Sequence, residues 1–138
     1  SVFRQLITFG GNPASCAAGI ENLRIMEAEN IVQNSADMGD YLFEKLQQLR
    51  SHEMVGDVRG GKGLLCAVEL VKNRETKEKF DPSFKLADKA TLLMKEHQLF
   101  GRAGDVIPIA PPLCISNDEI DHFVSQLDMV ITKLEANF

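Results

Sequence analysis

The sequence lacks any long hydrophobic run and any excess of basic residues. No apolar stretch approaches the roughly 20 residues that a membrane-spanning helix requires. Acidic residues outnumber basic ones, which gives a net charge of −5 and a pI near 5.2. No basic stripe with interleaved aromatic residues is present. These absences argue against a membrane protein and against nucleic acid as a partner.

Cysteine is also scarce. The three cysteines, Cys16, Cys66 and Cys114, are odd in number, widely spaced and set in apolar sequence. They predict reduced thiols in the core of a cytoplasmic protein, not a disulfide framework. None of the three histidines stands at metal-ligand spacing from another histidine or a cysteine, so no metal site is expected.

What is present is the composition of an ordinary soluble domain. The 138 residues are 44% hydrophobic and 25% charged, enough for one domain with a real core. The chain begins Ser-Val-Phe, without an initiator methionine, and reaches a functional-looking loop within a few residues. We therefore expect it to be the C-terminal part of a longer protein.

Four helices are predicted from the spacing of apolar residues and from end signals. They cover residues 13–27, 31–49, 81–98 and the stretch that follows residue 116. The fourth has the strongest start signal, because Ser116-Asn117-Asp118-Glu119 reads as a capping box.

Short β-rich runs separate these helices. Residues 55–70 predict two strands around a glycine-rich bend, and residues 99–100, 106–109 and 113–115 suggest further strands. The order of elements predicts an α/β fold, a two-layer small domain in which helices cover a short, mainly antiparallel sheet. The mixed-charge run 72–79 reads as a solvated loop.

The bend at residues 56–63 nearly matches a nucleotide-binding loop. Gly63 stands where that pattern needs Ser or Thr, and a strand-like run follows where a helix is required. A glycine hinge between two strands is the better interpretation. No G-x-S-x-G elbow is present either, which leaves a serine hydrolase without support.

The stretch Thr8-Phe9-Gly10-Gly11-Asn12-Pro13 is the most informative part of the chain. Glycines allow a ligand to approach the backbone closely, Asn is a good helix N-cap, and Pro suits the first helical position. A hydroxyl, bare amides and a helix N-terminus together suit an anion such as a phosphate.

This stretch resembles the Thr-aromatic-Ser/Gly-Gly-His/Asn-Pro signature of the class III (omega) aminotransferases, which are fold-type I enzymes dependent on pyridoxal 5'-phosphate (PLP). The resemblance extends over essentially the whole chain. Matching segments follow in family order at Glu27, Glu29, Val58-Arg59-Gly60, Gly63-Leu64, Glu69-Leu70 and Ala110-Pro111-Pro112-Leu113.

The resemblance implies a division of roles. Residues 1–12 would be a linking segment with the cofactor-phosphate loop, and residues 13–138 the C-terminal small domain of the enzyme. Thr8 and Phe9 would be cofactor-binding residues, with Thr8 on the phosphate of the PLP held mainly by the other subunit of a homodimer. The Schiff-base lysine would lie upstream of this chain, so no catalytic residue is assigned here and the chain alone is expected to be inactive.

Arg102 is the candidate substrate residue. Its planar guanidinium suits a carboxylate, and a similarly placed Arg in pyruvate-using relatives binds the carboxylate of the 2-oxo acid. Ornithine-type members carry an Arg at the position of Pro108, so its absence favours the amine:pyruvate group. This implies transfer of an amino group from a primary amine or omega-amino acid to a 2-oxo acid such as pyruvate.

Two alternatives remain open. A PLP enzyme of the same fold could perform lyase or racemase chemistry, since class III relatives include both. The absent lysine also allows a non-catalytic α/β interaction module.

Overall fold

The computed structural model describes residue 8 and residues 10–136. The chain divides into two compact units, Ser1–Val32 and Gln33–Phe138, and each is described by itself. The predicted division after residue 12 stays a prediction.

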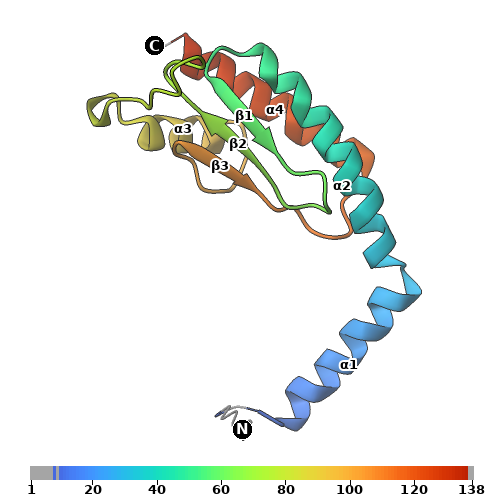
Figure 1. The fold of residues 1–138 in the computed structure, drawn as a ribbon. Coiled ribbons are helices and arrows are strands. Elements are labelled where there is room, and N and C mark those ends of the chain that lie inside the picture. Colours follow the sequence, from blue (N-terminus) through green and yellow to red (C-terminus); the bar gives the residue numbers. More distant parts are fainter. Residues whose placement is uncertain (1–7, 9, 137–138) are drawn as a thin grey trace, which may run out of the picture. The chain divides into compact units, whose positions relative to one another are not determined.

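The first unit contains helix α1 (Pro13–Ala28) and the first residues of α2 (Figure 1). The Asn12 side chain caps α1 by accepting a hydrogen bond from the Ser15 amide at 3.1 Å, and Pro13 occupies the first helical turn. Asn30, in the left-handed conformation, separates α1 from α2. The predicted first helix is confirmed, but none of its residues is buried.

The second unit is built on a three-stranded antiparallel sheet in the order β1-β2-β3. The strands are β1 (Val55–Arg59), β2 (Cys66–Leu70) and β3 (Val106–Ile109). Along β2 and β3 every second residue is buried, because a two-layer domain covers one sheet face only. The predicted two-layer α/β fold with a mainly antiparallel sheet is confirmed.

Helices α2 (Ile31–Gln47), α3 (Leu86–Glu96) and α4 (Asn117–Glu135) supply the covering layer (Figure 1). A short 3-10 helix, η1 (Gln48–Ser51), continues α2 toward β1. The helices and the buried face of the sheet share one hydrophobic core. Its fully buried larger side chains are Leu42, Leu46, Leu49, Val55, Val68, Leu70, Ile107, Ile120, Leu127, Val130, Ile131 and Leu134.

The fourth helix begins as its sequence predicts. The Glu119 amide donates to Ser116 Oγ at 3.4 Å, and the Ser116 amide donates to Glu119 Oε2 at 2.9 Å, which completes the capping box. The hydrogen bonds that the Ser116 amide and hydroxyl donate to the Glu119 carboxylate lower the pKa of this carboxyl. Phe123, expected on the apolar face, is only half-buried, and Val124 is buried beside it.

The third helix starts later than predicted. Asp81 caps a separate 3-10 turn, η2 (Pro82–Phe84), rather than an α-helix. Lys85 then adopts the left-handed conformation, with φ +53, and α3 begins only at Leu86. An Asp-Pro signal predicts where a helical turn begins, but it does not predict the length of the helix.

Two of the predicted strands are wrong. The Leu99 amide donates to the Met94 carbonyl at 2.8 Å, so residues 99–100 close the end of α3 instead of pairing with a strand. The Ile115 amide donates to the Pro112 carbonyl at 3.1 Å, so residues 113–115 form a turn before α4.

The hairpin between β1 and β2 confirms the glycine hinge. Gly61 and Gly63 have φ of +84 and +65, values that favour glycine. The half-buried Phe43 ring of α2 lies against Gly60 and Gly61, and Gly39 of the same helix lies against Gly63. Strand β2 follows this bend, as the hinge interpretation expects.

The predicted core thiols are correct for one cysteine only. Cys66 is buried, and this burial raises the pKa of its thiol. Cys16 and Cys114 are exposed, because α1 buries no residue and Cys114 lies in the turn after Pro111-Pro112.

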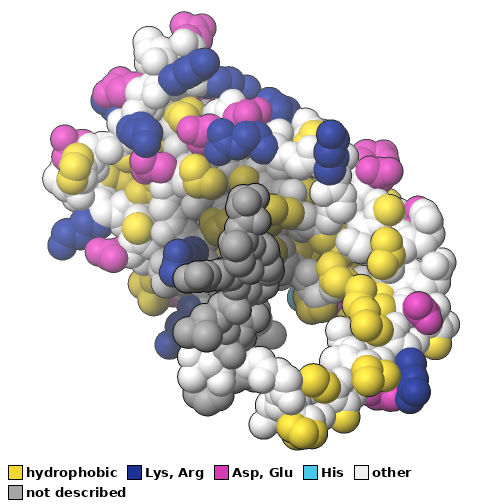
Figure 2. Space-filling model, turned by 60° about the horizontal axis from the view of Figure 1, so that its bottom comes forward, with side chains coloured by type: hydrophobic (Ala, Val, Ile, Leu, Met, Phe, Trp, Pro, Cys, Tyr) yellow, Lys and Arg dark blue, Asp and Glu magenta, His cyan; other side chains and the backbone are white. Residues whose placement is uncertain are grey.

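The surface carries charges of both signs. On the face shown in Figure 2, lysine and arginine side chains lie among aspartates and glutamates instead of forming a block of one sign. The run 72–79 is exposed throughout, which confirms the predicted loop. Within the described part of the chain, no helix is long and apolar enough to cross a membrane.

Candidate functional site

Thr8 stands at the start of an exposed turn that leads into α1. The turn contains Gly10 and Gly11, and Gly11 has φ +77. A β-carbon built on Gly11 would meet no atom of the described residues within 4 Å. Phe9, the other predicted cofactor residue, lies outside the described residues.

The start of α1 has the electrostatics that an anion needs. No acidic side chain lies in its first turn, and the aligned peptide dipoles place partial positive charge at this end. The Asn12 cap uses the Ser15 amide.

Arg102 lies in the loop between α3 and β3. The loop is held at both sides, because Leu99 and Ala103 are half-buried and pack against the core. Between these anchors Phe100, Gly101 and Arg102 are exposed. No carboxylate or carbonyl of residues 8 and 10–136 pairs with the Arg102 guanidinium, which leaves it free for an outside carboxylate.

An apolar groove of about 340 Å³ lies beside this loop. Its lining includes Phe100 and Gly101 of this loop and residues 107–112. Pro108 is exposed on β3 and has no hydrogen-bonding side chain. Arg102 follows Gly101, which lines this groove, in the sequence.

Thr8 and Arg102 belong to different compact units. The local contacts of Thr8 and those of Arg102 therefore come from separate parts of the structure. Both are exposed, as binding residues must be. Their roles stay predictions.

Comparison with known proteins tests the resemblance. Residues 3–131 match the family model described as aminotransferase class-III. The chain belongs to the class III aminotransferase family.

Similar relatives include an uncharacterized aminotransferase, YhxA, of Bacillus subtilis, 43% identical over 88% of this chain and 28% of the relative. A taurine–pyruvate aminotransferase of Rhodobacter capsulatus is 39% identical over 97% of this chain and 30% of the relative. The chain therefore spans about 30% of the length of the curated relatives it matches.

A solved structure supports the same fold. An (S)-enantioselective omega-transaminase from Thermomicrobium roseum superposes with a TM-score of 0.89 and 37% identity. The superposition covers 97% of this chain and 30% of that structure. The fold is thus that of one part of a fold-type I transaminase.

Class III aminotransferases imply PLP, and the residues at the start of α1 fit its phosphate. Thr8 would offer a hydroxyl, the open side of Gly11 would admit the group, and α1 would supply amides and partial positive charge. Among the described residues, no group of three or more His, Cys, Asp or Glu could hold a metal ion.

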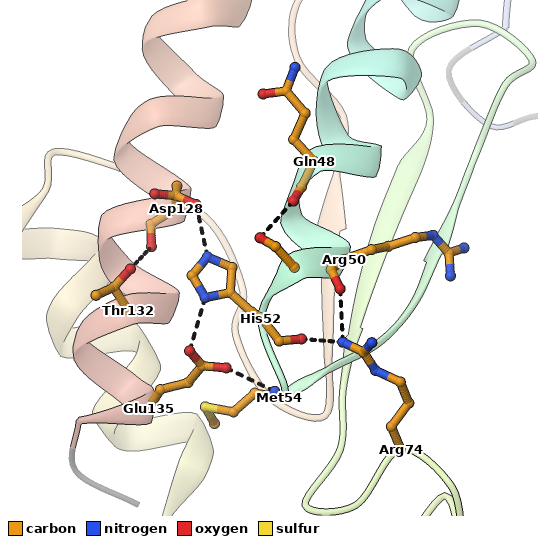
Figure 3. A network of polar contacts seen from close by, with 9 residues as sticks. Gln48, Arg50, His52, Met54, Arg74, Asp128, Thr132 and Glu135 are labelled. Carbon is orange, nitrogen blue, oxygen red and sulfur yellow. Dashed lines mark hydrogen bonds and ion pairs between the residues drawn. The ribbon is translucent and has the colours of Figure 1, made fainter.

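Sequence reasoning missed a polar cluster away from the family motifs. His52, at the end of η1, has Nδ1 2.9 Å from Glu135 Oε2 and Nε2 2.8 Å from Asp128 Oδ1, both on α4 (Figure 3). Arg74 donates to the carbonyls of His52 and Arg50 from the loop after β2. Asp128 and Glu135 are 76 and 83 residues from His52 in sequence, so no local pattern in the sequence predicts these contacts.

A second polar contact joins α2 to α4. Asp121 accepts from the Tyr41 hydroxyl at 2.9 Å and pairs with Lys45 Nζ at 2.8 Å. The Lys45 and Tyr41 bonds lower the pKa of Asp121, and the bond to Asp121 raises that of Lys45. This contact is a direct polar link between the two helices.

Proposed function

We propose that this chain is the C-terminal part of a PLP-dependent transaminase. The whole enzyme moves an amino group from a primary amine or omega-amino acid to a 2-oxo acid such as pyruvate. The likeness of nearly the whole chain to an omega-transaminase fold supports this proposal. The chain alone is inactive, because the lysine that binds the cofactor covalently belongs to the part of the enzyme that this chain does not span.

In this proposal PLP supplies the electron sink for the reaction when it is bound. Thr8 donates its hydroxyl to the cofactor phosphate, and the amides at the start of α1 add to the positive potential there. These groups anchor the phosphate end and so fix the position of the reacting end. Phe9, next in sequence, adds a contact to the cofactor.

Arg102 holds the carboxylate of the 2-oxo acid. Its guanidinium presents parallel N–H groups that match two carboxylate oxygens. The exposed loop between Leu99 and Ala103 presents this fork toward the substrate. Pro108 offers no charge for the second carboxylate or amine of an ornithine-type substrate, which favours pyruvate as the acceptor.

The remaining parts of the proposal concern assembly and location. We infer a homodimer with a shared active site, in which Thr8 contacts the cofactor held mainly by the partner subunit. We place the enzyme in the cytoplasm. The homodimer rests on the shared active site that the family resemblance implies, and the location rests on the reduced cysteines that the sequence predicts.

One experiment tests the proposed function. The full-length protein is examined by visible absorbance before and after borohydride reduction, and amine consumption is then followed with and without pyruvate. We expect a yellow protein that loses its band on reduction, carries the cofactor on a lysine N-terminal to Ser1, and consumes amine only with pyruvate. Consumption without a 2-oxo acid would instead indicate a lyase or racemase. A colourless protein that ignores PLP would indicate an interaction module.

A further inference from the structure

The cluster around His52 joins the end of the last helix to the entrance of the sheet. His52 is the C-cap of η1 and lies three residues before β1. Its side chain is 12% exposed, and both of its partners lie on α4 (Figure 3). The ring is therefore a cross-link between two elements that are far apart in sequence.

The two contacts determine the protonation of the ring. An ionised carboxylate can only accept a hydrogen bond, so each ring nitrogen facing one must carry a proton. Asp128 Oδ1 lies 2.8 Å from Nε2 and Glu135 Oε2 lies 2.9 Å from Nδ1. With both contacts made, His52 is an imidazolium that donates in both directions.

The two arms of this cross-link are unequal. Glu135 is 28% exposed, and its second oxygen accepts the Met54 amide at 2.9 Å. Asp128 is 51% exposed and can exchange the ring for water. If the ring stopped donating to Glu135, a partly buried carboxylate oxygen would lose a hydrogen bond. This costs more free energy than the loss of the bond to Asp128, whose carboxylate is hydrated.

We propose that His52 is a proton-operated latch on the C-terminal helix: the imidazolium holds Asp128 and Glu135 together, and loss of one proton releases Asp128 while the Glu135 contact remains. The neutral ring then keeps its proton on Nδ1. Both contacts are made while the ring is protonated and the two carboxylates are ionised, and the Asp128 contact is lost when the ring loses a proton.

The surroundings favour the closed state. Burial of the ring lowers its pKa, but the hydrogen bonds that the ring donates to Asp128 and Glu135, together with their negative charges, outweigh burial, so the pKa of His52 is raised. A raised pKa extends the imidazolium form toward neutral pH.

Other charged groups near His52 form hydrogen bonds with its main chain or ion pairs with each other. The two carboxylates of α4 face the ring itself. Arg74 donates to the carbonyl of His52, and Arg50 pairs with Asp57 at 2.7 Å. Glu53, the next residue, is exposed. Among residues 8 and 10–136, two carboxylates pair with the ring, and the Arg74 guanidinium is bound to main-chain oxygen.

The latch can be tested by NMR on the full-length protein labelled with ¹⁵N-histidine, in which the His52 signals are identified by their loss in His52→Gln. We expect the His52 midpoint to lie above the ordinary value of about 6.5. Above that midpoint, Nδ1 should keep the signature of a protonated nitrogen and Nε2 should lose it. A midpoint at or below about 6.5, or a neutral ring protonated on Nε2, would overturn the proposal.

Three variants separate the two arms. Asp128→Asn should lower the midpoint and leave the exchange of the Met54 amide within about twofold. Glu135→Gln should lower the midpoint and speed that exchange about tenfold or more, the size expected for a bond to a charged group. Asp118→Asn removes a charge from the first turn of the same helix and serves as the control. An equal effect of all three would mean general electrostatics and no latch.

Discussion

Gly39 of α2 lies directly against the backbone of Gly63 in the β1–β2 hairpin. A β-carbon at Gly39 would come within 2.6 Å of the Gly63 Cα and 2.5 Å of its carbonyl oxygen. Backbone cannot move aside as a flexible side chain can. The pair therefore sets how closely the helix can approach the sheet.

Replacing Gly39 with alanine should separate the helix from the hairpin. We expect Gly39→Ala to destabilise the chain by about 1–3 kcal/mol, as overpacking does, measured by urea unfolding. Gly19→Ala is the matched control, since a β-carbon there meets nothing within 4 Å and alanine favours a helix by about 0.5–1 kcal/mol. Equal effects of the two substitutions would show that the contact does not limit packing.

The capping box of α4 should contribute measurably to stability. Ser116→Ala removes the hydroxyl that accepts the Glu119 amide, and we expect a loss of about 0.5–2 kcal/mol. Ser125→Ala, an exposed position inside the same helix, should not destabilise. Unfolding midpoints of the two variants in urea distinguish a cap effect from a general effect of losing a serine hydroxyl.

Stability should depend on pH through His52. Because its folded pKa is raised, the stabilisation is fully present below the unfolded value of about 6.5 and is lost as pH rises through the folded pKa. His52→Gln should remove this fall. Thermal unfolding between pH 5 and pH 9 compares the two proteins, and parallel curves would show that His52 contributes no pH dependence.

Thr8 should matter for cofactor retention in the full-length enzyme. Thr8→Val keeps the shape but removes the hydroxyl, and we expect PLP to bind about tenfold to a hundredfold more weakly, as for loss of a bond to a charged group. Thr8→Ser should retain most of the affinity. Thr91→Val removes an exposed hydroxyl from α3 as a control. Unchanged PLP affinity in Thr8→Val would remove Thr8 from the site.

Arg102 should distinguish charged from uncharged substrates. We expect Arg102→Ala to raise the KM for pyruvate about tenfold or more, while the KM for an uncharged amine changes little. Arg102→Lys keeps the charge but loses the planar fork, so it should restore part of the effect. Steady-state kinetics with both substrates tests this, and equal changes in the two KM values would count against a carboxylate role.

Local signals in the sequence predicted most of the fold. The Asn12-Pro13 and Ser116–Glu119 signals each act within one helical turn, and both helices begin where these residues predict. The Asp81-Pro82 signal also acted locally, but it started only a 3-10 turn, because Lys85 leaves the helical conformation.

The contacts that could not be predicted from the sequence join residues that are far apart along the chain. The closeness of Gly39 to Gly63 and of His52 to α4 arises only when the layers pack. Cys16 looked like a core residue because its neighbours are apolar, but α1 buries none of its own side chains. The candidate site was different: the Thr8–Pro13 motif is contiguous, and a contiguous motif can be recognised without a fold.

The uneven exposure of the cysteines gives the chain native attachment points for probes. Cys16 lies in the first compact unit and Cys114 in the second, and both are exposed, whereas Cys66 is buried with a raised thiol pKa. A thiol-reactive nitroxide should therefore modify the outer two and spare the third. Spin–spin measurements on this chain would then report the separation of the two units without a single engineered residue.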